Sequence, residues 1–297
     1  MTSIKEIRRN ISSLQRLHTI TKAMEAVSIT KMKRAQDRAG ANAAYFRSLL
    51  RITTNYLDAF SSYLSEREEE RREGKVCLLL VTSDKGLVGN LNAETVRHAQ
   101  PFLDEHPDAD SICIGRKGYE HLRRQQRSVS FHRINVSDHV SLEDLEDVAD
   151  HITEQYTSGA VSHVSMIFQH FVSTFTQQPT TIQILPLNHQ QVIDNLKKTV
   201  FHNNESEDMG AAQYTVEPDL NRIFDRLFSL LMKVSVYSAL VENKASEHSA
   251  RMIAMKNARD TSEEMIQKKH LLLNKQRQTA ITNEVLESLG GMQALGV

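Results

Sequence analysis

The sequence predicts an α/β protein that combines a long antiparallel coiled coil of its N- and C-terminal helices with a Rossmann-like α/β domain. All five prolines of the 297 residues lie between positions 101 and 218, and glycine is absent from 211–289. Since these two residue types interrupt regular structure, long stretches without them mark long helices. Strand-like and helix-like patterns alternate between the two helices, which is typical of a mostly parallel sheet.

The first predicted element is a helix over residues 1–62, whose apolar stripe begins with the 3-4 spacing of a coiled-coil seam. We expect the first part of this stripe to consist of Ile4, Ile7, Ile11, Leu14, Leu17, Ile20, Met24 and Val27. The same helix is basic, because residues 1–38 hold nine Lys or Arg and three acidic residues, a net charge of +6. Such a local excess of one charge suggests a dedicated partner surface.

The middle of the chain has a different sequence pattern from the two predicted long helices. We predict a charged linker at 63–75, an α/β globular domain at 76–190 and a connecting segment at 191–216. Apolar runs bounded by turn residues indicate strands, and amphipathic stretches indicate helices. The expected strands are 75–81, 110–115, 128–136, 163–172 and 181–187, and the expected helices are 92–103, 116–126 and 141–157.

The last predicted element is a helix over 217–297 that begins at Glu217-Pro218-Asp219, where proline and acidic residues suit a first turn. We expect its regular pattern to end at Gly290-Gly291. Eight of the ten positions 224, 227, 231, 234, 238, 241, 245, 248, 252 and 255 are apolar, which predicts a one-sided seam. Because a long helix must bury its stripe against a partner, we expect the first helix (1–62) and the last to form one antiparallel coiled coil.

Composition excludes several classes of protein. The formal net charge of −1 argues against a general nucleic-acid binder. No apolar run approaches the ~18 residues that span a bilayer, and the N-terminus has no hydrophobic signal core. Cys77 and Cys113 each lie in an apolar run, so we interpret them as small buried hydrophobes in a reducing compartment.

Catalytic motifs are missing from the sequence. The turn at 82–90 contains GLVG after a strand, but neither GxGxxG nor GxxxxGK[ST] occurs. We interpret this turn as a tight strand-to-helix connection that Asp84 and Lys85 cap and solvate. The thirteen histidines show no metal-ligand spacing, so His248 is expected to be packed and hydrogen-bonded. The acids within SLEDLEDVAD (141–150) fit a solvated, amphipathic helix face, and no role is assigned to the wider acidic stretch 138–154. No catalytic, cofactor or metal site is predicted.

Three stretches of sequence carry a family resemblance. IKEIRRNISSL…ITKAMEAVS…KMKRAQ near the start and ENKASEHSARMIAMKNARD…NKQRQTAITNEVLE near the end resemble the gamma subunit of F-type ATP synthases. In the middle, VTSDKGLVGNLN is similar to that family's T/S-D-R-G-L-C-G-x-L-N pattern. The resemblance covers essentially the whole chain and implies a non-catalytic central rotor shaft.

The resemblance also implies contact residues and partners. The partners would be the alpha and beta subunits of the catalytic ring, the epsilon subunit and the membrane c-ring, with no nucleic acid and only indirect membrane association. The implied location is the cytoplasmic face of the bacterial plasma membrane. The implied rotor–stator contacts, including Arg251 as a position tied to coupling between the helices, are Lys22, Met24, Lys31, Lys33, Arg34, Arg251, Arg277, Gln278, Thr282 and Glu284.

Two other functions stay open from the residues alone. The chain could be a coiled-coil scaffold or tether that uses its α/β domain for docking. Residues 75–190 could instead form a nucleotide-dependent catalytic domain, although the phosphate-binding glycines are missing.

Overall fold

The computed structural model describes residues 3–41, 48–49, 52, 74–186 and 220–294. The chain divides into two compact units. We call Met1–Ser28 with Arg251–Val297 the helical unit, and Ile29–Ala250 the sheet unit. Helix α1 (Ile4–Ala41) and helix α8 (Leu220–Ala294) contribute residues to each unit, and each unit is described by itself.

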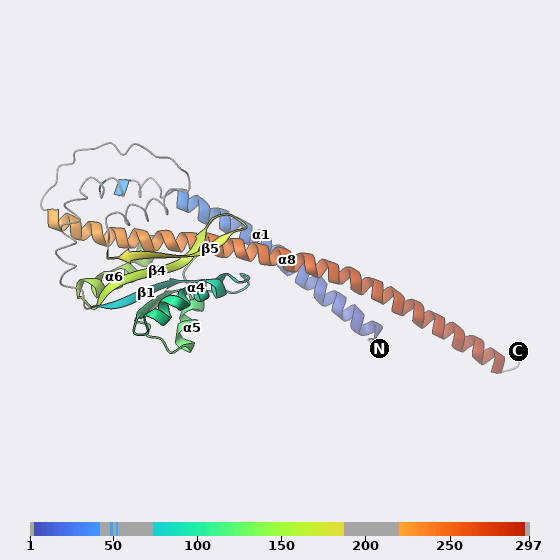
Figure 1. Cartoon of the computed structure of the whole chain (residues 1–297). Helices are drawn as coiled ribbons and strands as arrows, with labels where there is room; N and C mark the ends of the chain where they lie inside the picture. Colours follow the sequence, from blue (N-terminus) through green and yellow to red (C-terminus); the bar gives the residue numbers. More distant parts are fainter. Residues whose placement is uncertain (1–2, 42–47, 50–51, 53–73, 187–219, 295–297) are drawn as a thin grey trace. The chain divides into compact units, whose positions relative to one another are not determined.

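The sheet unit contains five strands in the order β3-β2-β1-β4-β5, as Figure 1 shows in part. The strands are β1 (Lys75–Val81), β2 (Asp110–Ile114), β3 (Phe131–Arg133), β4 (Val161–Phe171) and β5 (Gln177–Leu185). Strand β1 pairs in parallel with β2 and β4, β2 pairs in parallel with β3, and only β5 is antiparallel to its neighbour. The predicted mostly parallel Rossmann-like sheet is therefore confirmed.

Helices cover each face of this sheet. They are α4 (Leu91–Glu105), α5 (Arg116–Arg124) and α6 (Glu146–Thr157), the last preceded by a short 3-10 turn, Glu143–Leu145. On β1, Leu78 and Leu80 pack in the cluster with residues of α4 and α5, whereas Leu79 and Val81 pack in the cluster with residues of α6 and α8. The alternation is the period-two pattern of a strand buried on each side.

Each cysteine is buried, free and on a different face of the sheet. Cys77 belongs to the cluster that contains α8, and Cys113 to the cluster that contains α4 and α5. Burial raises the pKa of Cys113 to about 12, and burial also raises that of Cys77 far above its ordinary value. The interpretation of these residues as small buried hydrophobes is confirmed.

Between Val236 and Ser249, helix α8 is buried on all its sides rather than along a single seam. The positions of the predicted seam from Leu227 to His248 are buried, as expected. However, every residue from Val236 to Ser249 is buried as well, including the charged side chains of Glu242, Lys244 and Glu247. The prediction of a one-sided seam was therefore wrong for this part of the helix, where all faces are buried.

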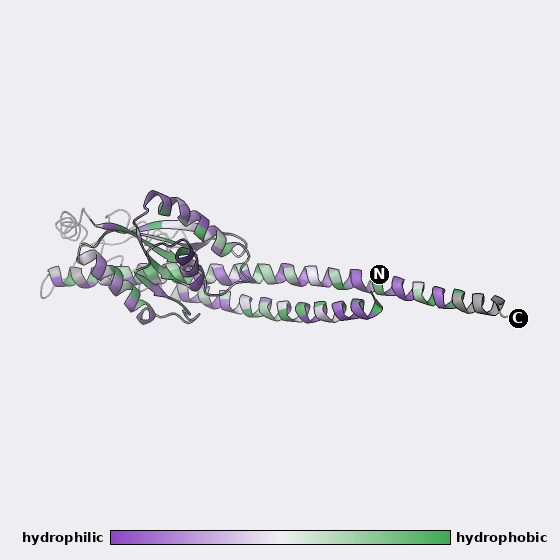
Figure 2. Cartoon of the chain, turned by 90° about the horizontal axis from the view of Figure 1, so that it is seen from below, coloured by the Kyte–Doolittle hydropathy of each residue, from purple (hydrophilic) through white to green (hydrophobic). Residues whose placement is uncertain are grey.

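In the helical unit, α1 and α8 pack along each other, but the buried positions of α1 differ from the predicted stripe. Ile7 and Ile11 are buried as expected, whereas Leu17, Ile20 and Val27 are exposed. The buried positions farther along are Thr21 and Ser28. Figure 2 shows polar and apolar residues alternating along these helices, so hydropathy alone does not mark the contact face.

Small hydroxyl residues account for this difference. Thr21 Oγ1 donates to the carbonyl oxygens of Leu17 and His18, each at 3.0 Å, and Ser28 Oγ donates to that of Met24 at 2.7 Å. On α8, buried Ser262 Oγ donates to the Ala258 carbonyl oxygen at 2.6 Å. Because each hydroxyl is satisfied by its own helix, the two backbones can approach closely without leaving a buried polar group unpaired.

The ends of the predicted segments are only partly described. The predicted helix to residue 62, the linker 63–75 and the segment 191–216 lie almost entirely outside the described residues. At the other end, α8 continues through Gly290-Gly291 to Ala294, so the expected stop at these glycines was wrong. A helix glycine costs only ~1 kcal/mol relative to alanine, which a long cooperative helix can absorb.

A test of the fold uses Gly115, which has a φ of 98° between β2 and α5. A Cβ atom there would lie 2.1 Å from the carbonyl oxygen of Thr82, whereas a Cβ atom at exposed Gly86 would meet nothing within 4 Å. We therefore expect Gly115→Ala to lower the free energy of unfolding by about 2 kcal/mol or more. Gly86→Ala should change it by about 1 kcal/mol or less. Urea unfolding followed by circular dichroism measures each value, and equal stability of the two variants would contradict the prediction.

Candidate functional site

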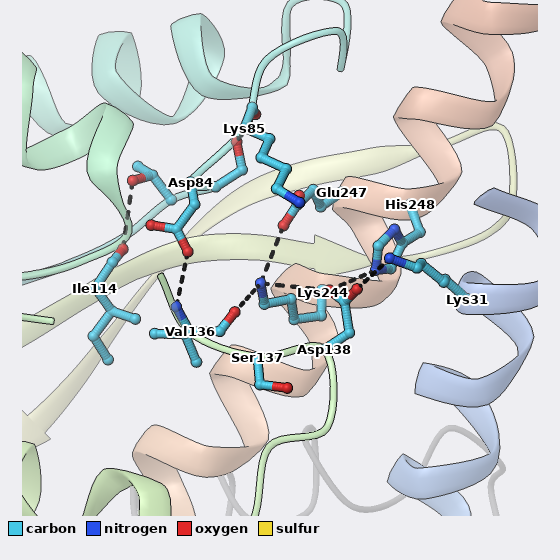
Figure 3. A network of polar contacts seen from close by, with 12 residues as sticks. Lys31, Asp84, Lys85, Ile114, Val136, Ser137, Asp138, Lys244, Glu247 and His248 are labelled. Carbon is cyan, nitrogen blue, oxygen red and sulfur yellow. Dashed lines mark hydrogen bonds and ion pairs between the residues drawn. The ribbon is translucent and has the colours of Figure 1, made fainter. Parts of the chain in front are cut away.

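The carboxyl ends of strands β1, β2 and β3 meet at one edge of the sheet, which is where open α/β sheets ordinarily bind a ligand. Here the Asp84 carboxylate takes that position (Figure 3). Asp84 Oδ1 accepts hydrogen bonds from the backbone N–H of Arg116 at 3.0 Å and of Asn135 at 2.9 Å. Its Oδ2 accepts one from the backbone N–H of Val136 at 3.0 Å, which Figure 3 shows. Three backbone amides that could otherwise hold an anion therefore hold a side chain of the chain itself.

The backbone at Asn135 makes this arrangement possible. Its φ of 59° lies in the left-handed region, which asparagine tolerates better than most residues. The Asn135 side chain is also held, since its Oδ1 accepts a hydrogen bond from Arg116 Nη2 at 2.8 Å. The sequence prediction that Asp84 only caps and solvates its own turn was incomplete, because this carboxylate binds two other segments.

Asp138, three residues farther along, binds each of the long helices. Its Oδ2 lies 2.6 Å from Lys31 Nζ on α1, and its Oδ1 lies 3.1 Å from His248 Nε2 and 3.7 Å from Lys244 Nζ on α8. We call these four residues, Lys31, Asp138, Lys244 and His248, the Asp138 junction. Figure 3 shows their side chains converging from the two helices and the loop.

Electrostatics favour the ionised carboxylate at this junction. The hydrogen bond from His248 holds the pKa of Asp138 well below its usual range, with further lowering from Lys31 and Lys244 and a smaller opposing effect of burial. The Lys244 and His248 side chains are buried, with exposures of 8% and 3%. A buried cation needs a partner of opposite charge, so Asp138 is held in place by residues that cannot easily return to water.

Further contacts tie the same loop to the helices. Lys244 Nζ donates to the Val136 carbonyl oxygen at 3.1 Å and lies 3.6 Å from Glu247 Oε2. Arg38 of α1 donates to the Asp138 carbonyl oxygen. Figure 3 also shows the Lys85 side chain pointing toward Glu247. The prediction that His248 is a packed, hydrogen-bonded residue is confirmed, and its bonding partner is now identified.

A second polar contact joins the sheet to α8 through His170 and Glu242. His170 Nδ1 on β4 lies 2.5 Å from Glu242 Oε2 on α8. The hydrogen bond to Glu242 raises the pKa of His170, against a smaller opposing effect of burial. The protonated histidine therefore stabilises the packing of the helix on the sheet.

The predicted rotor–stator residues differ in exposure. Met24 and Lys31 are half-buried, and the Lys31 ammonium is bound by Asp138. Arg251 is buried, with an exposure of 8%. Thr282 Oγ1 donates to the Gln278 carbonyl oxygen at 2.9 Å within its own helix. The exposed members of the set are Lys22, Lys33, Arg34, Arg277, Gln278, Thr282 and Glu284.

Sequence reasoning missed a set of exposed apolar residues on the helices of the helical unit. The members on α1 were assigned to the seam, and the stretch on α8 to the continuing apolar pattern. The most exposed of them, between 46% and 71%, are Leu17, Ile20, Val27, Met265, Leu271, Ile281, Val285 and Leu286. Large apolar side chains that remain exposed make these helix positions candidates for contact with another chain.

A cleft of about 450 Å³ lies between α4 and α5. Arg97, Lys117, His121 and Arg124 give it a basic lining, together with Asn92, Ala93, Val96 and Gln100. No carboxylate or thiol is part of that lining. Within the described residues, no group of three or more His, Cys, Asp or Glu side chains is arranged to hold a metal ion. None of the described helices is long and apolar enough to cross a membrane.

Comparison with known sequences gives matches over nearly the whole chain. The model of the ATP synthase family matches residues 3–295. The ATP synthase gamma chain of Psychrobacter sp. (strain PRwf-1) is 34% identical over 299 aligned residues, covering 99% of this chain and 100% of the relative. The ATP synthase gamma chain of Legionella pneumophila (strain Paris) is 33% identical with the same coverage.

Solved structures give a matching fold. A chain of the Euglena gracilis mitochondrial ATP synthase, from an assembly of OSCP, F1 and c-ring, superposes with a TM-score of 0.69 at 19% identity, covering 98% of this chain and 94% of that one. A chain of the central stalk and c-ring structure of the Tetrahymena thermophila mitochondrial ATP synthase superposes with a TM-score of 0.57 at 28% identity, covering 80% and 99%.

The His170–Glu242 pair predicts a dependence of stability on pH. Because the folded-state pKa of His170 is raised above the unfolded value of 6.5, the stabilisation is fully present below that pH and is lost as the pH rises through the raised pKa. We expect the difference in unfolding free energy between wild type and His170→Gln to be larger at about pH 5.5 than at about pH 9. Thermal unfolding across this range measures it. His163→Gln, on the same strand and bonded to Ser162, is the control and should keep the wild-type pH dependence.

Proposed function

Because the chain belongs to the ATP synthase gamma-chain family, we propose that it is the central stalk subunit of an F-type ATP synthase. In this role it couples ion-driven rotation of the membrane c-ring to conformational change at the catalytic beta subunits. The observation that carries the proposal is the full-length match to gamma chains, together with a fold in which the two terminal helices pack along each other. The complex would synthesise or hydrolyse ATP, depending on the ion gradient.

We propose that the chain itself is not catalytic. A nucleotide bound at the sheet would need the amides at the carboxyl ends of the strands, and Asp84 already takes three of them. Catalysis would instead take place on the beta subunits. A rotor that contacts each beta subunit with a different face shifts each one toward a different conformation, because its contacts with those conformations differ in free energy.

The contacts with the catalytic ring are proposed from the helix residues. The exposed cations Lys22, Lys33 and Arg34 suit acidic segments of the beta subunits, and the charge difference would steer assembly. The exposed apolar residues of the helical unit would be covered by the alpha and beta subunits. The other proposed contacts are half-buried Met24, the Asp138-bound Lys31 and buried Arg251. Toward the C-terminal end of α8, the proposed contacts are Arg277, Gln278, Thr282 and Glu284.

The sheet unit is proposed to dock on the epsilon subunit and the c-ring. This places the chain at the cytoplasmic face of the bacterial inner membrane as a peripheral protein that reaches the membrane only through its complex. The bacterial gamma chains among its relatives support this location. We propose no nucleic-acid partner, in agreement with the net charge of −1.

Two alternative functions predict different behaviour. A scaffold or tether would form a homodimer through its long helices, and the exposed apolar residues on those helices give it some support. A nucleotide-dependent enzyme would bind ATP, ADP or NAD stoichiometrically in equilibrium dialysis, which the Asp84 arrangement argues against.

The stoichiometry of the purified complex tests the rotor against the scaffold. We expect native mass spectrometry of a complex purified through a tag on this chain to give one copy with three alpha and three beta chains. The reason is that a single asymmetric shaft must serve three sites in turn. A stable homodimer without alpha and beta chains would support the scaffold instead. A tag on the beta chain should recover the same complex and serves as the control.

A helix-breaking substitution tests whether the long helix must be continuous. Met252 is half-buried in the middle of α8. Met252→Pro removes a helix hydrogen bond and should cost ~3 kcal/mol or more, with loss of assembly or of coupled ATP synthesis. Met252→Leu, which conserves volume, should cost less than about 1.5 kcal/mol and keep coupling. Assembly is read by gel filtration and coupling by ATP synthesis in membrane vesicles. Normal coupled synthesis with Met252→Pro would count against the shaft assignment.

A further inference from the structure

We propose that the Asp138 junction is the mechanical joint of the chain, the point at which the α/β domain binds each long helix and transmits torque to it. The proposal rests on the rotor function proposed above. It assigns a mechanical role to the edge of the sheet that similar folds use for a ligand.

The joint is fixed to the sheet on its domain side. Asp84 follows β1 and binds the amides of Arg116, at the start of α5, and of Asn135 and Val136, beyond β3. The loop that carries Asp138 is therefore tied to three strand ends within three residues of that carboxylate. Force applied to the loop is passed to the backbone of the parallel sheet rather than to a free segment.

On the helix side, the joint holds α1 and α8 with one carboxylate. Each Asp138 oxygen has its own partner, Lys31 on α1 for Oδ2 and His248 on α8 for Oδ1. Lys244 adds a bond to the Val136 carbonyl oxygen one turn away on α8. Figure 3 shows the loop lying between the two helices with these side chains pointing into the same space.

Charged hydrogen bonds resist rotation of a helix against its domain better than apolar packing does. Residues such as Leu231, Val234 and Val241 give α8 an apolar contact with the sheet, and hydrogen bonds between β4 and Glu242, Asn243 and Ser246 of α8 add polar contacts. The Asp138 junction differs from these polar contacts because it also holds α1. Apolar burial depends on area and has no preferred direction, so it resists separation better than sliding or rotation. Charge-assisted hydrogen bonds require a particular distance and angle, and the Lys244 ammonium is buried, so rotating α8 against the loop would separate it from the Asp138 carboxylate.

The test measures the torsional stiffness of the assembled motor. The alpha–beta ring with this chain is fixed to a surface, a bead is attached to the α/β domain, and the angular fluctuation of the bead is recorded during catalytic pauses. We expect Asp138→Ala to increase the angular variance about twofold or more while assembly and ATP hydrolysis persist. A merely structural role would lower the yield of complex without changing the variance of the motors that assemble.

Two further variants keep the test decisive. Asp138→Asn has the same shape without the charge and replaces Asp138→Ala if the latter does not assemble. Asp147→Asn is the matched control, because it breaks the Arg133–Asp147 ion pair, which joins β3 to α6 within the α/β domain. Wild-type variance in each Asp138 variant, or an equal increase in Asp147→Asn, would overturn the joint. Absence of rotation with the wild-type chain would instead reject the proposed rotor function.

Discussion

The burial of α8 between Val236 and Ser249 is the constraint on which the rest of the structure depends. From Val236 to Ser249 the helix has no exposed face, yet this stretch includes Glu242, Lys244 and Glu247. Since a buried charge without a partner is strongly unfavourable, each of these charges needs a partner, and Lys244 and Glu247 lie 3.6 Å apart on the same helix. His170 and the Asp138 loop are the principal partners from outside the helix. The positions of the loop, the sheet and the first helix thus follow from the charges on the last helix.

The fold was largely predictable from sequence because its signals are local. Strand runs such as 75–81, helix patterns and the absence of proline each act over a short window, and the structure follows them closely. The seam of α1 was misread because hydropathy favoured Leu17, Ile20 and Val27, whereas Thr21 and Ser28 are the residues that pack. Their hydroxyls are satisfied within their own helix, which makes them compatible with burial at a close helix contact.

The polar site could not be predicted in the same way. Asp138 lies 107 residues from Lys31 and 110 residues from His248 in sequence, so no spacing links them. The solvated face was assigned to the acids of 141–150, and Asp138, which precedes them, was given no role. The sequence did contain one indication that Asp138 has a separate role, because it lies before the amphipathic helix pattern that begins at Leu142. The family resemblance supplied the function but not this network, because the motifs that carry the resemblance do not include Asp138.

The chemistry of the two cysteines has a practical consequence. Each thiol is buried in the sheet, and a pKa raised to about 12 for Cys113, or higher for Cys77, leaves almost no thiolate at neutral pH. Maleimide reagents attack thiolates, so the native protein is close to inert toward them. A cysteine introduced on an exposed helix position can therefore be labelled selectively with a fluorophore or spin probe, without first removing the natural cysteines and disturbing the core that contains them.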